Sequence, residues 1–538
     1  MPDAQNPKQR SRKSKAEAER RKPKVKVEIE IEIPYQETKW ILVSVILDTV
    51  RPLSNSNIAT NRHESEGQSA EVENKTHDEE YGWEHDPANP RNWSPPKKWT
   101  MATLVSLYAF VTPLASSIMA PSLLDVAIKF SITDSTVIAL TLSIFLLSFA
   151  IGPLFAAPLS EMYGRVWVLH LANLFFFTFN LGCALSRTTV SFIVFRFLAG
   201  LARSAPMACG GGVMSDLFAE RDRASAMALY SIGPLIGPTI GPVMGGFIAE
   251  SVGVQYVFYV IIAISGVAAV IGIPLLRETY APVIRLRLNN MALDSEKATA
   301  GHPALQHEMG KWAYLWLNLK RPVMLLTRSF ILFMLSLYMS LIYGIYYLMF
   351  ATFPNLYSKV YHFSTGIGGL TYTGIGVGFL TASFFGARVS SKIYTYLAAK
   401  NGGKGKPEMR IPALIFGSFF VPVGLFWYGW SAQAKAHFMM PIICTAIFGF
   451  GLMTSFLPIQ LYLVDTFTYA ASAIAAASMF RSFLGFVFPL FGEQMFAALG
   501  YGEGNSLLAS LAIIIGIPFP VWIYFAGERI RAKSSFTR

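Results

Sequence analysis

The chain has 538 residues, of which 53% are hydrophobic and only 14% are charged. An average soluble protein carries roughly 25% charged residues, so the composition excludes a soluble globular protein and indicates a polytopic membrane protein. The formal net charge of +12 does not indicate nucleic-acid binding, because the Lys and Arg residues lie in tails and loops. The three cysteines are scattered in apolar segments and match neither a disulfide framework nor a zinc-binding spacing.

The first predicted unit is a polar N-terminal region, residues 1–96, which we expect to be largely disordered and cytoplasmic. Residues 1–26 are basic and residues 64–86 are acidic, and such blocks are usually solvated. No apolar stretch follows the basic start directly, so we predict no signal peptide. The apolar segment WILVSVILDTV at 40–50 is too short to span a bilayer, and we assign it no function.

Apolar runs of about 20 residues, the length that crosses a hydrocarbon core, recur from residue 97 onward. We predict twelve spans, at 99–120, 135–157, 166–186, 190–212, 226–249, 255–276, 329–353, 366–386, 412–431, 438–460, 471–492 and 506–526. The predicted units are an N-terminal six-helix bundle (97–278), a cytoplasmic central loop (279–328), a C-terminal six-helix bundle (329–527) and a cytoplasmic tail (528–538). Both termini are expected in the cytoplasm, because the connections on that side hold most of the Lys and Arg residues between spans.

A faint internal repeat supports two related halves. The sequence DLFAERDRASA begins at Asp216 after the fourth span, and DTFTYAASA begins at Asp465 after the tenth. Both read Asp-x-Phe and then Ala-Ser-Ala at the start of the next span. Parallel repeats of this kind occur where two halves are related by an axis along the membrane normal.

The connection between spans two and three, APLSEMYGR (157–165), is a candidate conformational latch. Gly164 allows a tight turn, while Glu161 and Arg165 lie at the membrane edge and can pair with each other or with a neighbouring helix end. We interpret these three residues as a polar latch that holds helices together in one conformation and releases them in another. An ordinary solvated turn is the alternative.

This stretch resembles the loop-two-three signature of the major facilitator superfamily, in the P-L-S-E-x-Y-G-R variant common among fungal members. The match runs from Pro158 to Arg165, and the departures from the general form are Ala157, Met162 and Val166.

Span four carries Arg196, in FIVFRFLAGLARS. A charged side chain within the membrane costs at least about 2.5 kcal/mol on insertion scales. Arg196 must therefore face a polar cavity, find a partner, or extend toward the outer surface. Its position resembles the R-x-x-x-G pattern of the superfamily, with Gly200 in place, and the resemblance implies a link to proton coupling.

Span five contains SIGPLIGPTIGPVMGG (231–246), with a glycine every four residues. This spacing places successive glycines about 40° apart on a helix, so they form a narrow stripe against which another helix can pack closely. The prolines remove backbone hydrogen bonds and bend the helix. The segment GPVMGG resembles the G-P-x-x-G-G signature of exporters within the superfamily. The predicted antiporter-motif residues are Gly237, Gly241, Pro242, Gly245 and Gly246.

Aromatic residues in span seven and a Phe-Arg pair in span eleven are candidates for a central substrate cavity. Tyr343, Tyr346 and Tyr347 can stack on a flat apolar ligand, and packing in the core or against lipid is the alternative. Phe480 is equally ambiguous, and Arg481 would favour an anionic or phenolic substrate if it faced the cavity. No span contains an unambiguous central Asp or Glu, so the sequence does not identify the residue that carries a coupling proton.

Further stretches, including DPANPRNWSPPKKW before span one and RETYAPVI after span six, resemble the fungal twelve-span drug:proton antiporters over residues 85–538. The resemblance implies an all-α integral membrane protein with the major facilitator fold, twelve transmembrane helices in two pseudo-symmetric six-helix bundles. One departure is Gln255, which stands where the family commonly has Arg.

The implied function is the export of small amphipathic organic compounds (toxicants, drugs or secondary metabolites such as mycotoxins) by proton antiport and alternating access. We expect the plasma membrane as the location, with the vacuolar membrane as the alternative. The expected partners are a small organic substrate, protons and the lipid bilayer, without nucleic acid, cofactor, metal or enzymatic activity, and the chain is expected to be a monomer. An importer of the same fold, for polyamines, sugars or other small solutes, and a non-transporting membrane receptor are the alternatives.

Overall fold

The computed structural model describes residues 83–291 and 311–537, apart from 533 and 535. The regular elements among these residues are helices, with one β-bridge between Phe467 and Thr537. They belong to one compact unit, residues 81–538. The predicted N-terminal region up to residue 82, with its apolar segment 40–50, lies outside the described residues, as does the middle of the central loop (292–310).

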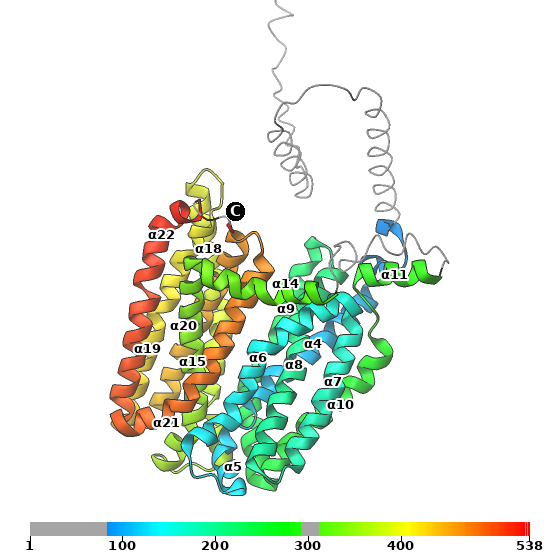
Figure 1. The fold of residues 1–538 in the computed structure, drawn as a ribbon. Coiled ribbons are helices and arrows are strands. Elements are labelled where there is room, and N and C mark those ends of the chain that lie inside the picture. Colours follow the sequence, from blue (N-terminus) through cyan, green and yellow to red (C-terminus); the bar gives the residue numbers. More distant parts are fainter. Residues whose placement is uncertain (1–82, 292–310, 533, 535, 538) are drawn as a thin grey trace, which may run out of the picture. The chain divides into compact units, whose positions relative to one another are not determined.

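Six long helices form the N-terminal bundle (Figure 1). They are α4 (Pro95–Ser117), α6 (Ser135–Tyr163), α7 (Arg165–Leu185), α8 (Thr189–Leu217), α9 (Glu220–Val252) and α10 (Val254–Leu275). A short helix η1 (Pro90–Asn92) precedes α4, and η2 (Ala120–Ser122) and α5 (Leu123–Phe130) connect α4 to α6. The turns before α7 and α10 are single glycines, Gly164 at φ 101° and Gly253 at φ 105°, a backbone conformation that glycine adopts readily.

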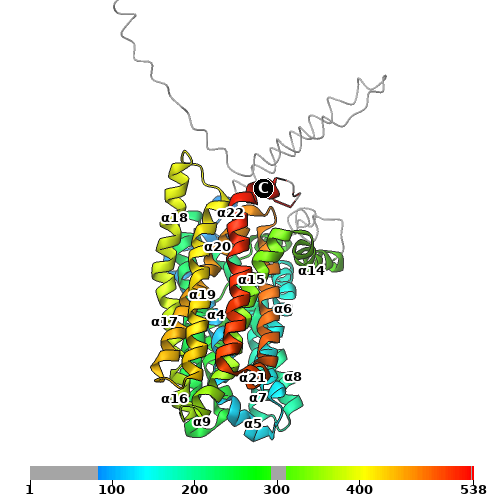
Figure 2. The same ribbon diagram turned by 90° about the vertical axis from the view of Figure 1, so that its left-hand side faces the viewer.

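The C-terminal bundle repeats this plan with more interruptions. Its elements are α15 (Phe330–Lys359), α16 (Thr365–Leu370), α17 (Thr373–Thr381), the π-helical turn η3 (Ala382–Gly386), α18 (Ala387–Lys400), η4 (Pro407–Arg410), α19 (Ile411–Gln433), α20 (Met439–Thr466), α21 (Ala470–Gly516) and α22 (Pro518–Arg531). Figure 2 shows α16, α17 and α18 following one another along one side. The helix of the predicted eighth span thus continues in α18 well beyond residue 386.

Eleven stretches of the described residues are long and apolar enough to cross a membrane, and the last one, Ala470–Arg531, has 62 residues. Gly500 interrupts that stretch with φ 80° and ψ 168°. The amide of Gly502 donates to Gln433 at the end of α19, whereas Glu528 pairs with Lys406 near the start of α19. The chain therefore reverses at Gly500 and crosses twice, which gives twelve crossings and confirms the predicted all-α membrane fold.

The two ends of the helices form two faces. We call the end at which α11 (Ala281–Met291), α14 (Lys311–Arg328) and the end of α22 lie the terminal face, and the end at which α5 lies the opposite face (Figure 1, top and bottom). Helices α11 and α14 lie within the connection that was predicted as a loop, and their formation was not anticipated from the sequence.

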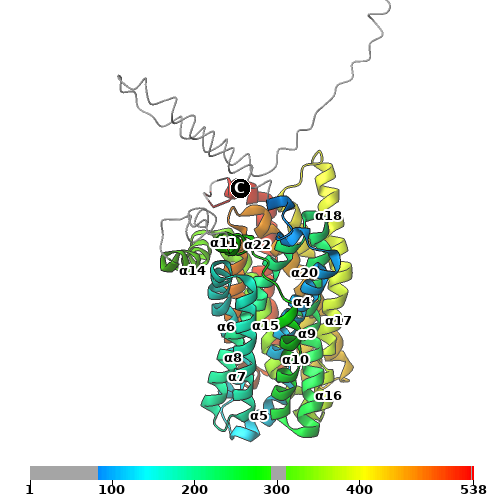
Figure 3. The ribbon, with the colours of Figure 1, turned by 90° about the vertical axis from the view of Figure 1, so that its right-hand side faces the viewer.

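The bundles meet along two seams. Helix α6 packs against α21, and α9 packs against α16 and α17 (Figure 3 shows α9 beside α16). Helices α4 and α15, the first of each bundle, are mostly buried, whereas α7 and α10 expose apolar side chains such as Leu174 and Val270, as expected for helices that face lipid. The bundles thus contact each other along α6 and α21 on one seam and along α9, α16 and α17 on the other.

Candidate functional site

The three predicted tyrosines form one cluster on α15 at the bundle interface. Ring centroids lie 5.1 Å apart for Tyr343 and Tyr347, 5.0 Å for Tyr346 and Tyr347, and 5.8 Å for Tyr343 and Tyr346. We call these residues the tyrosine cluster. The Oη atom of Tyr347 lies 3.1 Å from the Oγ atom of Ser116, so a hydrogen bond joins the middle of α15 to the last turn of α4 in the other bundle. The cluster is therefore in the core between the bundles and does not face lipid.

Arg481 on α21 joins this cluster, whereas Phe480 does not. The guanidinium of Arg481 lies 4.7 Å from the ring centre of Tyr343 and 5.6 Å from that of Phe456, and its buried Nε atom has no hydrogen-bond partner among the described residues. Phe480 instead stacks on Phe333 at 5.9 Å. Adjacent residues on a helix point about 100° apart, so only one of the pair can face the tyrosines.

Arg196 is completely buried and does not extend to the surface. Its Nη1 atom donates to the carbonyl of Ala115 over 3.1 Å, and its guanidinium lies 4.7 Å from the ring centre of Phe145. The Nε and Nη2 atoms have no hydrogen-bond partner among the described residues. Since Ala115 precedes Ser116, adjacent residues of α4 hold Arg196 and Tyr347.

A second buried arginine, Arg203, was not selected from the sequence. It lies seven residues, or about two turns, after Arg196 on α8, so both arginines lie on one helix face. Its guanidinium donates to Asn173 Oδ1 over 2.8 Å and to the carbonyl of Tyr108, and it lies 4.8 Å from the ring centre of Phe176. The i, i+7 spacing in FRFLAGLARS was the available signal. Arg203 ties α4, α7 and α8 together and does not contact the tyrosine cluster.

The predicted latch gathers more partners than the sequence indicated. Arg165 pairs with Asp216 at the end of α8, with Nε and Oδ2 3.3 Å apart, and its Nη1 atom donates to Ser160 over 2.9 Å. Glu161 is close enough to add a second negative charge. Glu278, after α10, accepts hydrogen bonds from the amides of Arg165 and Val166 over 2.9 and 3.3 Å. Asp216 and Glu278 thus belong to the polar cluster around Arg165, which loop 157–165 alone did not reveal.

The glycine stripe of α9 packs against the backbone of α4. A Cβ atom added at Gly237 would lie 2.7 Å from Pro113, and one at Gly241 would lie 3.0 Å from the carbonyl oxygen of Leu114. At Gly245 the carbonyl of Ile118 occupies that position. Gly246 and Pro242 face the other bundle, where they meet Gly366 and Gly369 of α16. The five motif residues therefore serve two contacts, one within the N-terminal bundle and one across the interface.

Hydrogen bonds also join the bundles at the opposite face. Glu250 of α9 accepts from the amide of Gly366 over 2.6 Å and from Ser364 over 3.1 Å, and Asp125 accepts from Thr365 over 3.2 Å. On the other seam, Gln494 donates to Thr136 over 2.9 Å. These contacts hold the opposite face closed.

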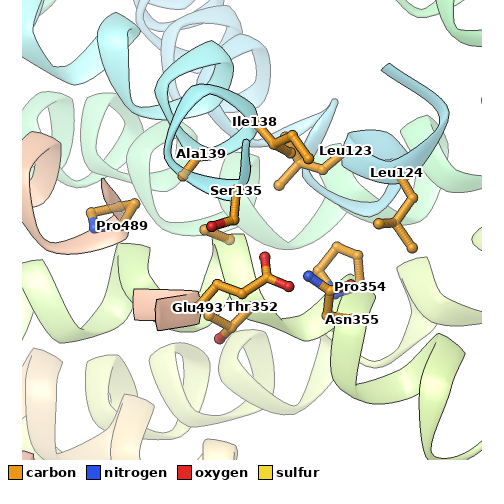
Figure 4. A pocket seen from close by; sticks show the side chains of 11 residues that line it. Leu123, Leu124, Ser135, Ile138, Ala139, Thr352, Pro354, Asn355, Pro489 and Glu493 are labelled. Atoms are coloured by element: carbon orange, nitrogen blue, oxygen red, sulfur yellow. The ribbon is translucent and has the colours of Figure 1, made fainter. Parts of the chain in front are cut away.

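A small pocket at the same face lies beside the seam of α6 and α21. Its lining comes from both bundles and includes Ser135, Thr352, Asn355 and Glu493, which Figure 4 shows around the pocket. The cavity measures about 10 Å³, which leaves room for about one water molecule. This pocket is therefore too small to hold an organic solute.

The sequence of this chain is similar to those of known transporters. The family model of the Major Facilitator Superfamily matches residues 105–489. The MFS transporter cpaT of Aspergillus oryzae is 43% identical over 484 residues, which cover 88% of this chain and 96% of that protein. The efflux pump vrtL of Penicillium aethiopicum is 43% identical over 455 residues, 84% of this chain and 90% of that protein.

Among solved structures, the partially occluded inward open conformation of the xylose transporter XylE from E. coli matches with a TM-score of 0.57. It is 14% identical and covers 80% of this chain and 97% of that chain. This likeness concerns the fold alone, and together with the family match it confirms the predicted fold class.

Proposed function

The chain belongs to the Major Facilitator Superfamily and is a transporter rather than an enzyme, and on this premise we propose that it is a secondary active efflux transporter for small amphipathic organic compounds. The observation that carries the proposal is the tyrosine cluster with Arg481, which places aromatic rings and a half-buried cation together between the bundles. Rings stack on flat apolar solutes, and an arginine without a hydrogen-bond partner on Nε favours a substrate with a phenolic or anionic oxygen.

Export is favoured over import by two further observations. The relatives include a protein named as an efflux pump, at 43% identity, and the glycine stripe of α9 with its GPVMGG segment resembles the exporter signature. XylE and a D-xylose–proton symporter share the fold at 14% and 16% identity, which bears on the architecture and not on direction. A sugar importer is therefore the second candidate.

We propose that transport proceeds by alternating access, with the bundles moving relative to each other along the two seams. In the present conformation the opposite face is closed by the contacts of Glu250, Asp125 and Gln494. We propose that the substrate enters from the terminal face, that the bundles then rock, and that these contacts break while the terminal face closes. We further propose that the terminal face is cytoplasmic, that the protein lies in the plasma membrane, and that proton entry drives the cycle.

Accumulation of a fluorescent amphipathic compound tests export. Cells without their own efflux pumps should accumulate less of the compound when they express the protein, and R481Q should lose most of this effect. The matched control is R388Q, which alters an exposed arginine on α18. Its described hydrogen bond is to the carbonyl of Phe384, four residues earlier in the chain. Equal accumulation with and without the wild-type protein would contradict export.

Counterflow in vesicles with an imposed pH gradient separates the candidates. An antiporter should load vesicles whose interior is made acidic, in the orientation that mimics export, and a symporter should respond to the opposite gradient. Deletion of residues 1–84 tests the receptor alternative, because a transporter should keep most of its flux.

A further inference from the structure

A groove between α7 and α10 lies away from the bundle interface and has no part in the transport path described above. Its volume is about 710 Å³, within the range of roughly 300–1,000 Å³ that holds small ligands. Its walls are apolar and carry exposed side chains that point away from the bundle core: Trp167, Leu171 and Leu174 on α7, and Val270 and Ile273 on α10. The groove is therefore open to the surrounding lipid.

The length of the groove corresponds to one leaflet. It runs from Val166 at the terminal face down to Phe177, eleven residues later on the same helix. At 1.5 Å per residue this is about 17 Å, roughly half of a hydrocarbon core of about 30 Å. The floor at its deep end is Gly266, where an added Cβ would meet only Phe177, at 3.6 Å. These dimensions fit an acyl chain that enters from the leaflet at the terminal face.

The shallow end of the groove is polar and basic. Arg277 after α10 and Arg287 on α11 are both exposed there, and Lys97 is close enough to act on Arg277 electrostatically. His170 adds a buried Nδ1 atom that has no hydrogen-bond partner in the part of the chain that the structure describes.

The acidic residue in the lining, Glu278, offsets one of the two arginine charges but is held in place by the chain itself. Its carboxylate already accepts hydrogen bonds from the amides of Arg165, Val166, Thr279 and Tyr280. Charge-assisted bonds of this kind hold a carboxylate in place, so the available groups at this end are cationic.

We propose that this groove binds one anionic phospholipid, with its phosphate between Arg277 and Arg287 and an acyl chain between α7 and α10. Basic pockets between transmembrane helices suit anionic headgroups, and an apolar groove of one leaflet's depth suits the chain attached to them. A free phosphate would use only the basic end, and a neutral or zwitterionic lipid would gain little from the two arginines.

Retention of lipid by the purified full-length protein tests the proposal. After delipidation, phosphatidylglycerol or phosphatidylcholine of the same chain length is titrated back and bound lipid is counted by native mass spectrometry. The wild type should hold one phosphatidylglycerol in preference to phosphatidylcholine. The R277Q/R287Q double variant should bind phosphatidylglycerol about 30-fold more weakly. Each basic residue near an anionic lipid surface strengthens binding by about fivefold, and the variant lacks two of them. The control R529Q, an exposed arginine of the same face outside the groove, should bind as the wild type does.

A second variant separates the chain from the headgroup. G266L fills the deep end of the groove without a backbone clash, and it should weaken phosphatidylglycerol binding while the arginines remain. Inorganic phosphate at millimolar concentration should not displace the lipid. Equal retention of both lipids by the wild type, unchanged binding in R277Q/R287Q, or displacement by phosphate would overturn the proposal. The groove would then hold bulk lipid, another part of the chain or a free anion.

Discussion

Helices α9 and α21 occupy equivalent positions in the two bundles, but they pack in different ways. Along α9, glycines lie directly against the backbone of α4. Along α21, glycines face side chains: a Cβ at Gly485 would lie 3.1 Å from the ring of Tyr343, and one at Gly492 would lie 2.9 Å from Leu348. Side chains can change rotamer whereas a backbone cannot, so we infer that α9 and α4 move as a rigid pair, whereas α21 can shift against α15 when the substrate binds.

The two bundles also differ at the terminal face, in the exposure of an ion pair that both contain. In the N-terminal bundle, Arg165 pairs with Asp216, and these side chains are 9% and 20% exposed. In the C-terminal bundle, Arg410 pairs with Asp465, at 19% and 30% exposure. The two aspartates are those of the internal repeat, so the repeat marks one bridge used twice, with the first copy less accessible to water.

The largest effect that would test this contrast is expected from Gly245→Leu. The new side chain would overlap the carbonyl of Ile118, and overpacking of this kind costs about 1–3 kcal/mol or more. We expect transport to fall at least about fivefold, since such energies shift a two-state equilibrium roughly 5- to 150-fold. The measurement is efflux at matched surface expression. The control is G368L on α16, where an added Cβ meets nothing within 4 Å. Full activity in G245L would refute the rigid packing of α9 on α4.

The next effect concerns the opposite face, where the α9 seam uses a carboxylate and the α21 seam uses an amide. Glu250→Ala removes the acceptor of two hydrogen bonds from the start of α16, and a bond to a charged group is stronger than a neutral one, although solvent screening reduces it at an exposed residue. Gln494→Ala removes one neutral bond, which contributes about 1 kcal/mol. The reactivity of a cysteine introduced at this face toward a water-soluble thiol reagent should therefore rise more in E250A than in Q494A. The reverse order would mean that the α21 seam closes the face.

A smaller difference is expected between Asp216→Asn and Asp465→Asn. Removing one partner of a buried pair costs about 3–5 kcal/mol, and an exposed pair contributes about 0–1 kcal/mol. Both bridges lie between these limits, and the less exposed Arg165 should lose more. We expect the thermal midpoint of the purified protein to fall further in D216N than in D465N, by a few degrees. Equal shifts would show that exposure does not distinguish the two copies.

Much of this arrangement was predictable from the sequence, because apolar length, Lys and Arg placement and glycine spacing are local signals. The helix of α9 and its bare stripe follow from the four-residue period alone. What the stripe packs against does not, because α4 lies more than a hundred residues away. Asp216 and Glu278 were missed as members of the polar cluster for the same reason, since only the fold brings them to Arg165. Phe480 and Arg481 could not be separated without knowing which helix face meets α15.

The smallest predicted effect concerns Tyr347 of α15 and Ser116 of α4, which join the two bundles by one hydrogen bond. Tyr347→Phe and Ser116→Ala each remove that neutral bond, which contributes about 1 kcal/mol, so each should change the apparent substrate affinity by no more than about fivefold. If the bond forms during transport, the double variant should be no worse than either single one, because a double-mutant cycle reports the coupling of contacting residues. Additive losses would show that Tyr347 acts on the substrate independently of Ser116, and the contact between α4 and α15 would then be a binding surface and not a tie between the bundles.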